Sequence, residues 1–112
     1  LELRQLMETA IQFADNDTGR VVIVSIPDYG VTPFAQNMDS DKISEEIDNF
    51  NAIKREESEK LGLHFIDVTP ISRMAADDPG LLAEDGLHPS GKMYAEWVRL
   101  IFPVALDVLT ND

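Results

Sequence analysis

Residues 21–26 of the chain read Val-Val-Ile-Val-Ser-Ile, an almost unbroken run of apolar side chains, most of them β-branched. Such a run is typical of a parallel β-strand that is covered on both faces. Pro27, Asp28 and Gly30 follow it and predict a turn at the end of the strand. A second run, Leu-His-Phe-Ile-Asp-Val at residues 63–68, predicts another buried strand. The two runs together predict a sheet of at least two strands.

The segment between the two runs has the pattern of an amphipathic helix. Its apolar residues recur at steps of four, three and three, and charged residues occupy the other faces. The apolar positions are Ile43, Ile47, Phe50 and Ile53. A strand, a helix and a strand of this length predict a parallel crossover, which is almost always right-handed. The predicted fold class is therefore α/β.

Two further helices are expected at the ends of the chain. The first segment places apolar residues along one helical stripe up to the residues Asn16, Asp17 and Gly19, which we expect to end it. A last stripe follows Ser90, a natural N-cap, and Pro103 should kink or split that helix. The stripes contain Leu3, Leu6, Met7, Ala10, Phe13 and Ala14, and Tyr94, Trp97, Val98, Ile101, Ala105 and Val108. Residues 69–85 are polar and predict a loop with at most a short helix inside.

Length, composition and charge exclude several classes of protein. With 112 residues, 44% of them hydrophobic, the chain is the size of a single small domain. Nine basic against 21 acidic residues give a net charge of −12, which repels nucleic acid. No apolar run is long enough to span a bilayer, and the sequence shows no basic start followed by a short apolar stretch, the pattern of a signal peptide. The absence of cysteine excludes disulfides and thiolate metal sites, but it does not distinguish a reducing from an oxidising compartment.

The sequence Asp85-Gly86-Leu87-His88 carries the clearest chemistry of the chain. Two intervening residues allow a tight turn that brings the Asp85 carboxylate within hydrogen-bond reach of the His88 imidazole. The carboxylate can then select one tautomer of the ring and stabilise the imidazolium that forms during acyl transfer. The crossover upstream should set this turn beside the carboxyl ends of the strands, where sites form in open α/β sheets.

Residues 85–91, Asp-Gly-Leu-His-Pro-Ser-Gly, resemble the last block of the SGNH/GDSL hydrolases, Asp-x-x-His-Pro, which in that family precedes the C-terminal helix. Residues 21–27 resemble a late strand of the family, and residues 43–67 resemble the helix and strand that follow it. The resemblance implies that residues 1–112 are the C-terminal part of one three-layer α/β/α, flavodoxin-like domain, with about two strands and three helices present. His88 would be the general base and acid, Asp85 its orienting carboxylate, and the reaction hydrolysis of an ester or thioester through an acyl-serine. The resemblance implies no metal and no cofactor.

Other blocks of the family are absent from this sequence. The Gly-Asp-Ser block with the nucleophile, the oxyanion glycine and the Gly-x-Asn-Asp block all lie N-terminal to the matched regions in the family. Because the chain also begins at Leu1, without methionine, we expect it to be a fragment. Two strands cannot cover their own edges, so we expect it to pair with a missing N-terminal half or with a second copy. The segment Met38-Asp39-Ser40-Asp41 superficially resembles the nucleophile block, but it lacks the glycine and opens a helix where Ser40 and Asp41 are natural caps.

Several other polar residues are candidates for a functional site. His64 lies inside an apolar strand pattern without a carboxylate at matching spacing, which favours a structural role. Asp28 and Asp67 follow the two strands, where turn formation accounts for them. The acidic residues Asp77, Asp78 and Glu84, with His88, lack the pattern of a calcium loop.

Aromatic residues divide into two groups. Tyr94 and Trp97 lie on the apolar stripe of the last helix and are expected in the core, whereas Tyr29 and Phe34 follow the first strand and could line an acyl pocket. The alternative to the hydrolase is a non-catalytic α/β module that binds a protein partner and uses Asp85 and His88 only structurally.

Overall fold

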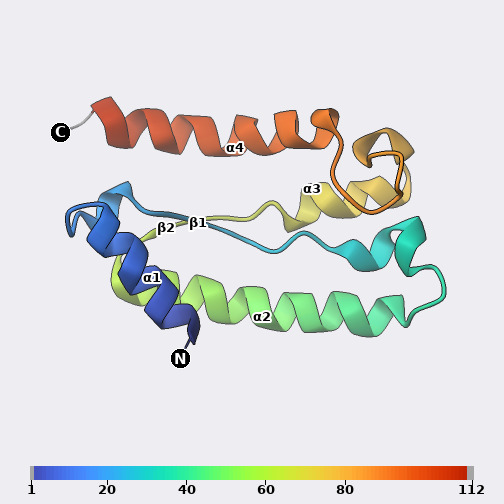
Figure 1. The fold of residues 1–112 in the computed structure, drawn as a ribbon, viewed down its shortest axis with the longest axis horizontal. Coiled ribbons are helices and arrows are strands. Elements are labelled where there is room, and N and C mark those ends of the chain that lie inside the picture. Colours follow the sequence, from blue (N-terminus) through green and yellow to red (C-terminus); the bar gives the residue numbers. More distant parts are fainter. Residues whose placement is uncertain (1, 111–112) are drawn as a thin grey trace.

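A computed structural model of the chain describes residues 2–110 and shows two short parallel strands between helices (Figure 1). The strands are β1 (Val22–Val24) and β2 (His64–Ile66), and the helices are α1 (Glu2–Phe13), α2 (Ser40–Leu61), α3 (Thr69–Arg73) and α4 (Gly91–Thr110). Helix α4 lies on one side of the strands and α2 on the other. Five 3-10 turns connect these elements: η1 (Thr18–Arg20), η2 (Tyr29–Val31), η3 (Pro33–Ala35), η4 (Met74–Ala76) and η5 (Pro79–Leu81). The molecule is a slab of 45 × 30 × 17 Å.

The two strands pair in parallel, with Val22 opposite His64 and Val24 opposite Ile66. The α/β class and the parallel crossover are thereby confirmed, although most of the described residues are helical. The prediction that both strands are buried on both faces is wrong: the three residues of β1 are all half-buried, and only Ile66 of β2 is buried. The sheet formed by the described residues has only two strands. It is therefore too narrow to bury the full apolar faces of the helices that cover it.

Helix α2 covers one face of the sheet and is longer than the predicted apolar stripe. Its N-cap is Asp39, whose carboxylate accepts a hydrogen bond from the Lys42 amide at 3.1 Å, so the expectation that Ser40 and Asp41 cap it is wrong by one residue. Gly62 ends the helix with φ of 73°, a conformation that glycine adopts without steric cost. Of the predicted stripe only Ile47 is buried, while Phe50 and Ile53 are exposed.

Helix α1 packs against the amino ends of the strands. Met7 lies at the centre of this contact with Val21 and Leu63. The helix ends at Phe13, and the next residues Asp15 and Asn16 turn the chain with positive φ, as the sequence predicted for this region.

Between β2 and α4 the chain forms the short helix α3 and the turns η4 and η5, in agreement with the predicted loop. Ala75, Leu81 and Met93 form a second apolar cluster that joins these turns to α4. Ser90 accepts a hydrogen bond from the Met93 amide at 3.4 Å, as expected for an N-cap.

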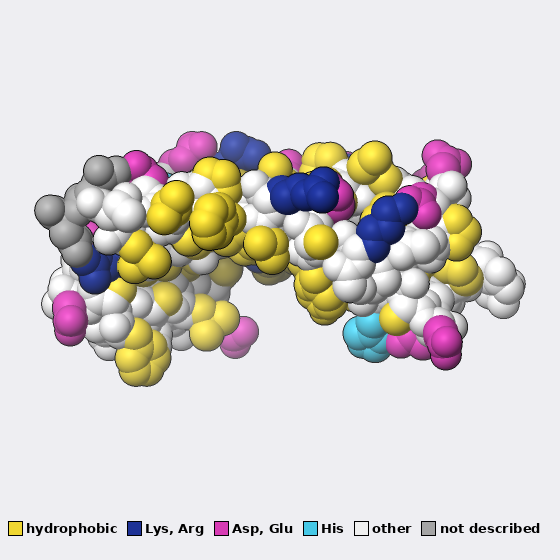
Figure 2. Space-filling view, turned by 90° about the horizontal axis from the view of Figure 1, so that it is seen from above, with side chains coloured by type: hydrophobic (Ala, Val, Ile, Leu, Met, Phe, Trp, Pro, Cys, Tyr) yellow, Lys and Arg dark blue, Asp and Glu magenta, His cyan; other side chains and the backbone are white. Residues whose placement is uncertain are grey.

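Helix α4 departs from its prediction in two respects. It continues through Pro103, so of the kink or split expected there the split does not occur. Its stripe is only partly buried, and Tyr94 and Val98 are exposed, with the Tyr94 ring edge-on against Trp97 at 5.2 Å. The expectation of Tyr94 in the core is therefore wrong. Figure 2, which looks down on α4, shows hydrophobic side chains along its outer surface. None of the helices among residues 2–110 is both long and apolar enough to cross a membrane.

Candidate functional site

Asp85 and His88 form a closed turn immediately before α4. One carboxylate oxygen of Asp85 accepts hydrogen bonds from the amides of Leu87 at 2.9 Å and His88 at 3.0 Å. Its other oxygen lies 2.5 Å from Nδ1 of the His88 ring. Gly86 permits this geometry because its φ is 68°, in the left-handed region that other residues adopt only at a cost. The predicted contact between the two side chains is thus present.

Neighbouring segments brace the turn on two sides. The Phe34 amide donates to the Gly86 carbonyl at 3.3 Å, and a side chain at Gly86 would meet Pro33 at 3.3 Å. On the other side the Ala83 amide donates to the His88 carbonyl at 2.7 Å, and Ser90 donates its hydroxyl to the Gly80 carbonyl. The turn is therefore held between η3 and η5, beyond the carboxyl ends of the strands.

The electrostatics of the turn favour an ionised carboxylate. Hydrogen bonds from the His88 ring, from the His88 amide and from the Leu87 amide lower the pKa of Asp85 from 3.8 to about 2. With the Asp85 carboxylate as acceptor, Nδ1 carries a proton and Nε2 is left as the basic nitrogen. The side chains are 71% exposed at His88 and 50% exposed at Asp85, so the pair stands open to solvent. The arrangement can accept a proton at Nε2 and stabilise the resulting imidazolium.

No serine among residues 2–110 forms a hydrogen bond with His88. Five of the six serines donate their hydroxyl hydrogen to another protein oxygen instead. They are Ser25, Ser44, Ser58, Ser72 and Ser90. The sixth, Ser40, is the first residue of α2, directly after its N-cap. The segment 38–41 is thus a helix start, as the sequence indicated.

The aromatic residues proposed for an acyl pocket lie beside the turn. Tyr29 and Leu87 line the same small cavity of about 50 Å³, and Phe34 reaches the turn through its amide. Both aromatic side chains are largely exposed. The structure therefore brings Tyr29 and Phe34 to the Asp85–His88 turn from a segment that lies more than 50 positions earlier in the chain.

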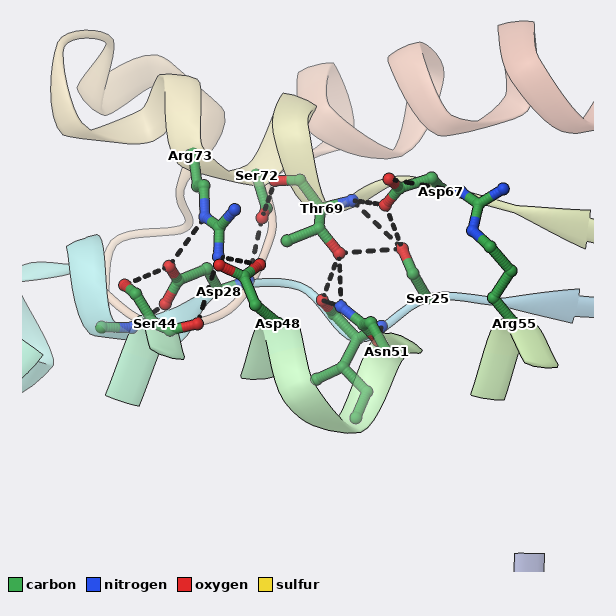
Figure 3. A network of polar contacts seen from close by, with 12 residues as sticks. Ser25, Asp28, Ser44, Asp48, Asn51, Arg55, Asp67, Thr69, Ser72 and Arg73 are labelled. Carbon is green, nitrogen blue, oxygen red and sulfur yellow. Dashed lines mark hydrogen bonds and ion pairs between the residues drawn. The ribbon is translucent and has the colours of Figure 1, made fainter. Parts of the chain in front are cut away.

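Asp28 lies at the centre of a polar network (Figure 3). The sequence predicted a structural role for Asp28 but none of its partners. The Asp28 side chain is fully buried and accepts hydrogen bonds from the Gly30 amide, from the Ser44 hydroxyl and from Nε of Arg73 at 3.0 Å. Arg73 also binds Asp48 at 2.7 Å. The network fastens η2 to α2 and α3, and η3 follows η2 directly, so it supports the wall against which the Asp85–His88 turn packs. In the sequence, the only sign of this network was the position of Asp28 shortly after a strand.

A second network crosses the carboxyl ends of the strands. Ser25 donates to Asp67 at 2.9 Å and accepts from the Val68 amide at 2.8 Å, and Thr69 donates to the Ile26 carbonyl at 2.7 Å (Figure 3). Asp67 also lies 3.8 Å from Arg55. Asp28 and Asp67 therefore organise the loops at the strand ends, in line with the structural role that was expected for both.

The other histidine and acidic residues considered from the sequence do not form a site with one another. His64 is half-buried in β2, Asp78 pairs with Lys92 at 2.7 Å, and Asp77 and Glu84 are exposed. Within the described residues no group of three or more histidine and acidic side chains could hold a metal ion. Trp97 is half-buried against the second apolar cluster, as expected.

No family model, no curated protein and no solved structure matches this chain significantly.

Proposed function

We propose that this chain carries the histidine and the aspartate of an ester hydrolase of the SGNH/GDSL type, which works through a Ser-His-Asp mechanism. One observation carries the proposal: Asp85 holds Nδ1 of His88 in a turn that leads into a helix beyond the carboxyl ends of a parallel sheet. A carboxylate on one ring nitrogen and a free second nitrogen is the arrangement that a general base in acyl transfer requires.

In the proposed reaction Nε2 of His88 takes the proton from a serine hydroxyl as the serine oxygen attacks the ester carbonyl. The imidazolium is stabilised by Asp85 and then gives its proton to the departing alkoxide, which leaves an acyl-serine. Water attacks the acyl-serine by the same steps, with His88 again as base and then as acid. The reaction needs no metal ion or cofactor.

The serine and the oxyanion donors belong, in this proposal, to polypeptide outside the described residues. The serines near the site have structural hydrogen bonds, and none of them lies on a strand-to-helix turn of the kind that exposes a nucleophile. The substrate is a small-molecule ester. In this proposal Tyr29 and Phe34 form one wall of its acyl pocket, because Tyr29 lines a cavity together with Leu87 of the turn, the Phe34 amide binds the Gly86 carbonyl, and both residues are partly exposed.

The test uses the natural gene product that contains these residues. A fluorophosphonate probe should label one serine of that protein, and His88→Ala should reduce ester turnover by about 10⁴-fold or more. Asp85→Asn should also be severe, since it favours the wrong tautomer of the ring. His64→Ala is the matched control and should leave turnover unchanged. Near wild-type rates in both the His88 and the Asp85 variants would refute the proposal.

The exposure of the pair, together with the lack of a serine bonded to His88, favours a second candidate function. In a non-catalytic α/β protein-interaction module the Asp85–His88 turn would only shape the loop before α4. This candidate predicts that no serine of the natural gene product reacts with the fluorophosphonate, and that His88→Ala alters partner binding without any effect on ester turnover.

A further inference from the structure

The loop of residues 28–35 braces the turn that holds the candidate site. At the far end of this loop the Phe34 amide donates to the Gly86 carbonyl at 3.3 Å, and an added Cβ at Gly86 would meet the Pro33 ring at 3.3 Å. Gly86 has the left-handed φ of 68° on which the closed turn depends. The position of the loop therefore contributes to the backbone conformation of the turn.

A chain of hydrogen bonds runs from this brace back toward the start of the loop. The Ala35 amide donates to the Thr32 carbonyl at 3.0 Å, and the amide and the hydroxyl of Thr32 both donate to the Tyr29 carbonyl, at 3.1 and 2.6 Å. Ala35 and Thr32 are buried, so the loop is packed against the rest of the protein as well as bonded within itself. We expect a displacement at Asp28 to reach Phe34 along this chain.

Arg73 anchors the start of the loop through the Asp28 carboxylate. Its Nε donates to Asp28 at 3.0 Å, and the Asp28 side chain is fully buried, whereas that of Arg73 is 34% exposed. The same guanidinium binds Asp48 of α2 at 2.7 Å, so that Arg73 joins α3, α2 and the loop at one point (Figure 3). Removal of the guanidinium would leave a buried carboxylate without its counter-ion, which costs far more than the loss of a surface ion pair.

The loop also meets the backbone on either side of the histidine. Asp28 and Thr32 line a small cavity of about 50 Å³ together with Leu87 and Pro89, the two neighbours of His88 in the chain. Because protein interiors are closely packed, a shift of the loop changes the surface against which these two neighbours lie. The loop therefore acts on the histidine by two routes, through the brace on the turn and through this shared cavity.

We propose that Arg73 is a positioning residue for His88. By holding the buried Asp28 carboxylate it keeps the loop, and through the loop the turn, in one geometry. In that geometry the Asp85 carboxylate accepts from Nδ1 of His88, and the ring is held in the tautomer that leaves Nε2 basic. This role rests on the proposed function of His88 as a general base, which needs that tautomer before it can take a proton.

The experiment measures the tautomer of His88 from the ring ¹⁵N signals of the ¹⁵N-labelled chain, at a pH where the ring is neutral. Arg73→Met should lower the ratio of the Nδ1–H to the Nε2–H tautomer by about threefold or more, a coupling of the size found between linked sites. Hydrogen exchange at the amides of Leu87 and His88, which donate to Asp85, should become faster in the same variant.

Two control variants separate positioning from a general loss of stability. Val21→Ala weakens the apolar cluster at the other end of the strands, and Asp48→Asn removes only the exposed partner of the guanidinium. Both should keep the tautomer ratio of the parent chain. If Arg73→Met does not fold, the double variant Asp28→Asn/Arg73→Met takes its place, since it leaves no buried charge without a partner, and it should show the same shift.

A folded Arg73→Met chain with the tautomer ratio of the parent would overturn the inference, because the turn would then hold itself without the loop. An equal shift in Val21→Ala would also overturn it, since the ring would then respond to stability alone. Ester turnover plays no part in these measurements. Unchanged turnover in the His88→Ala variant of the natural gene product would count against the proposed function instead, so the two failures are distinguishable.

Discussion

At the residue scale the Asp85 carboxylate is the group whose protonation the structure constrains most clearly. Three hydrogen bonds to the ionised form lower its pKa to about 2, whereas the carboxyl of an unfolded chain would have its ordinary pKa of 3.8. A depressed pKa means that the stabilisation is present above about pH 4 and is lost as the pH falls through about 2. We expect the ¹³C signal of the Asp85 carboxyl to titrate near pH 2, and its pKa to rise in His88→Ala, because that change removes the ring donor, which has the largest effect.

Gly86 allows a second test of the same turn. Its φ of 68° and the nearby Pro33 both oppose a side chain, so Gly86→Ala should destabilise the fold by about 1–2 kcal/mol and weaken the Asp85–His88 contact. Gly91→Ala is the matched control, because a side chain there meets no atom within 4 Å. Urea unfolding of both variants measures the difference, and equal stabilities would contradict the assigned geometry.

Asp28 is the residue on which the loops at the strand ends depend. Asp28→Asn keeps the shape but leaves the Arg73 guanidinium with one carboxylate fewer, and we expect a loss of about 2–3 kcal/mol, since Arg73 is itself 34% exposed. Asp48→Asn touches the same guanidinium from a position that is 59% exposed and should cost under about 1 kcal/mol. Chemical denaturation of the two variants gives the comparison, and a reversed order would show that the buried contact is unimportant.

At the element scale the N-cap of α2 differs between the sequence-based prediction and the structure. Asp39 caps the helix in the structure, so Asp39→Ala should cost about 1 kcal/mol of unfolding free energy. Ser40→Ala should cost little, because Ser40 is already inside the helix and alanine has the higher helix propensity. If Ser40→Ala were the more damaging change, the cap expected from the sequence would be the right one.

The helices α2 and α4 show that an amphipathic stripe predicts where a helix forms better than it predicts which residues of that helix are buried. Both helices form where their patterns indicated, yet Phe50, Ile53, Tyr94 and Val98 remain exposed. A stripe buries its residues only against a surface of matching width, and the described sheet is two strands wide. Pro103 shows the related point that a helix can continue through a proline, although proline has no amide hydrogen to donate.

At the scale of the whole molecule the 112 residues should bind no serine-directed probe by themselves. The Asp85–His88 pair can take up a proton, but acyl transfer also needs a hydroxyl within roughly 3 Å of the ring and donors for the oxyanion. We expect no gain of mass when the chain is treated with a fluorophosphonate, and no hydrolysis of a chromogenic short-chain ester. Stoichiometric labelling of a serine in this chain, abolished in His88→Ala, would show that the nucleophile lies among these residues.

The order and type of the elements and the Asp85–His88 contact were predictable from the sequence, because each of these depends on residues that are close along the chain. β-branched runs form strands, periodic stripes form helices, and two residues between an aspartate and a histidine suffice to close a turn around Gly86. The predicted N-cap of α2 was wrong by one residue, because neighbouring polar residues can all fill this role and the structure uses Asp39.

Contacts between residues that are distant in the sequence became visible only in the folded chain. Arg73 and Ser44 converge on the buried Asp28, Pro33 and Phe34 brace the turn at Gly86, and Lys54 reaches the Val24 carbonyl of β1. These contacts depend on how α2 and α3 pack against the strand ends, and such packing is set by the shape and charge of whole surfaces, which no local spacing in the sequence encodes.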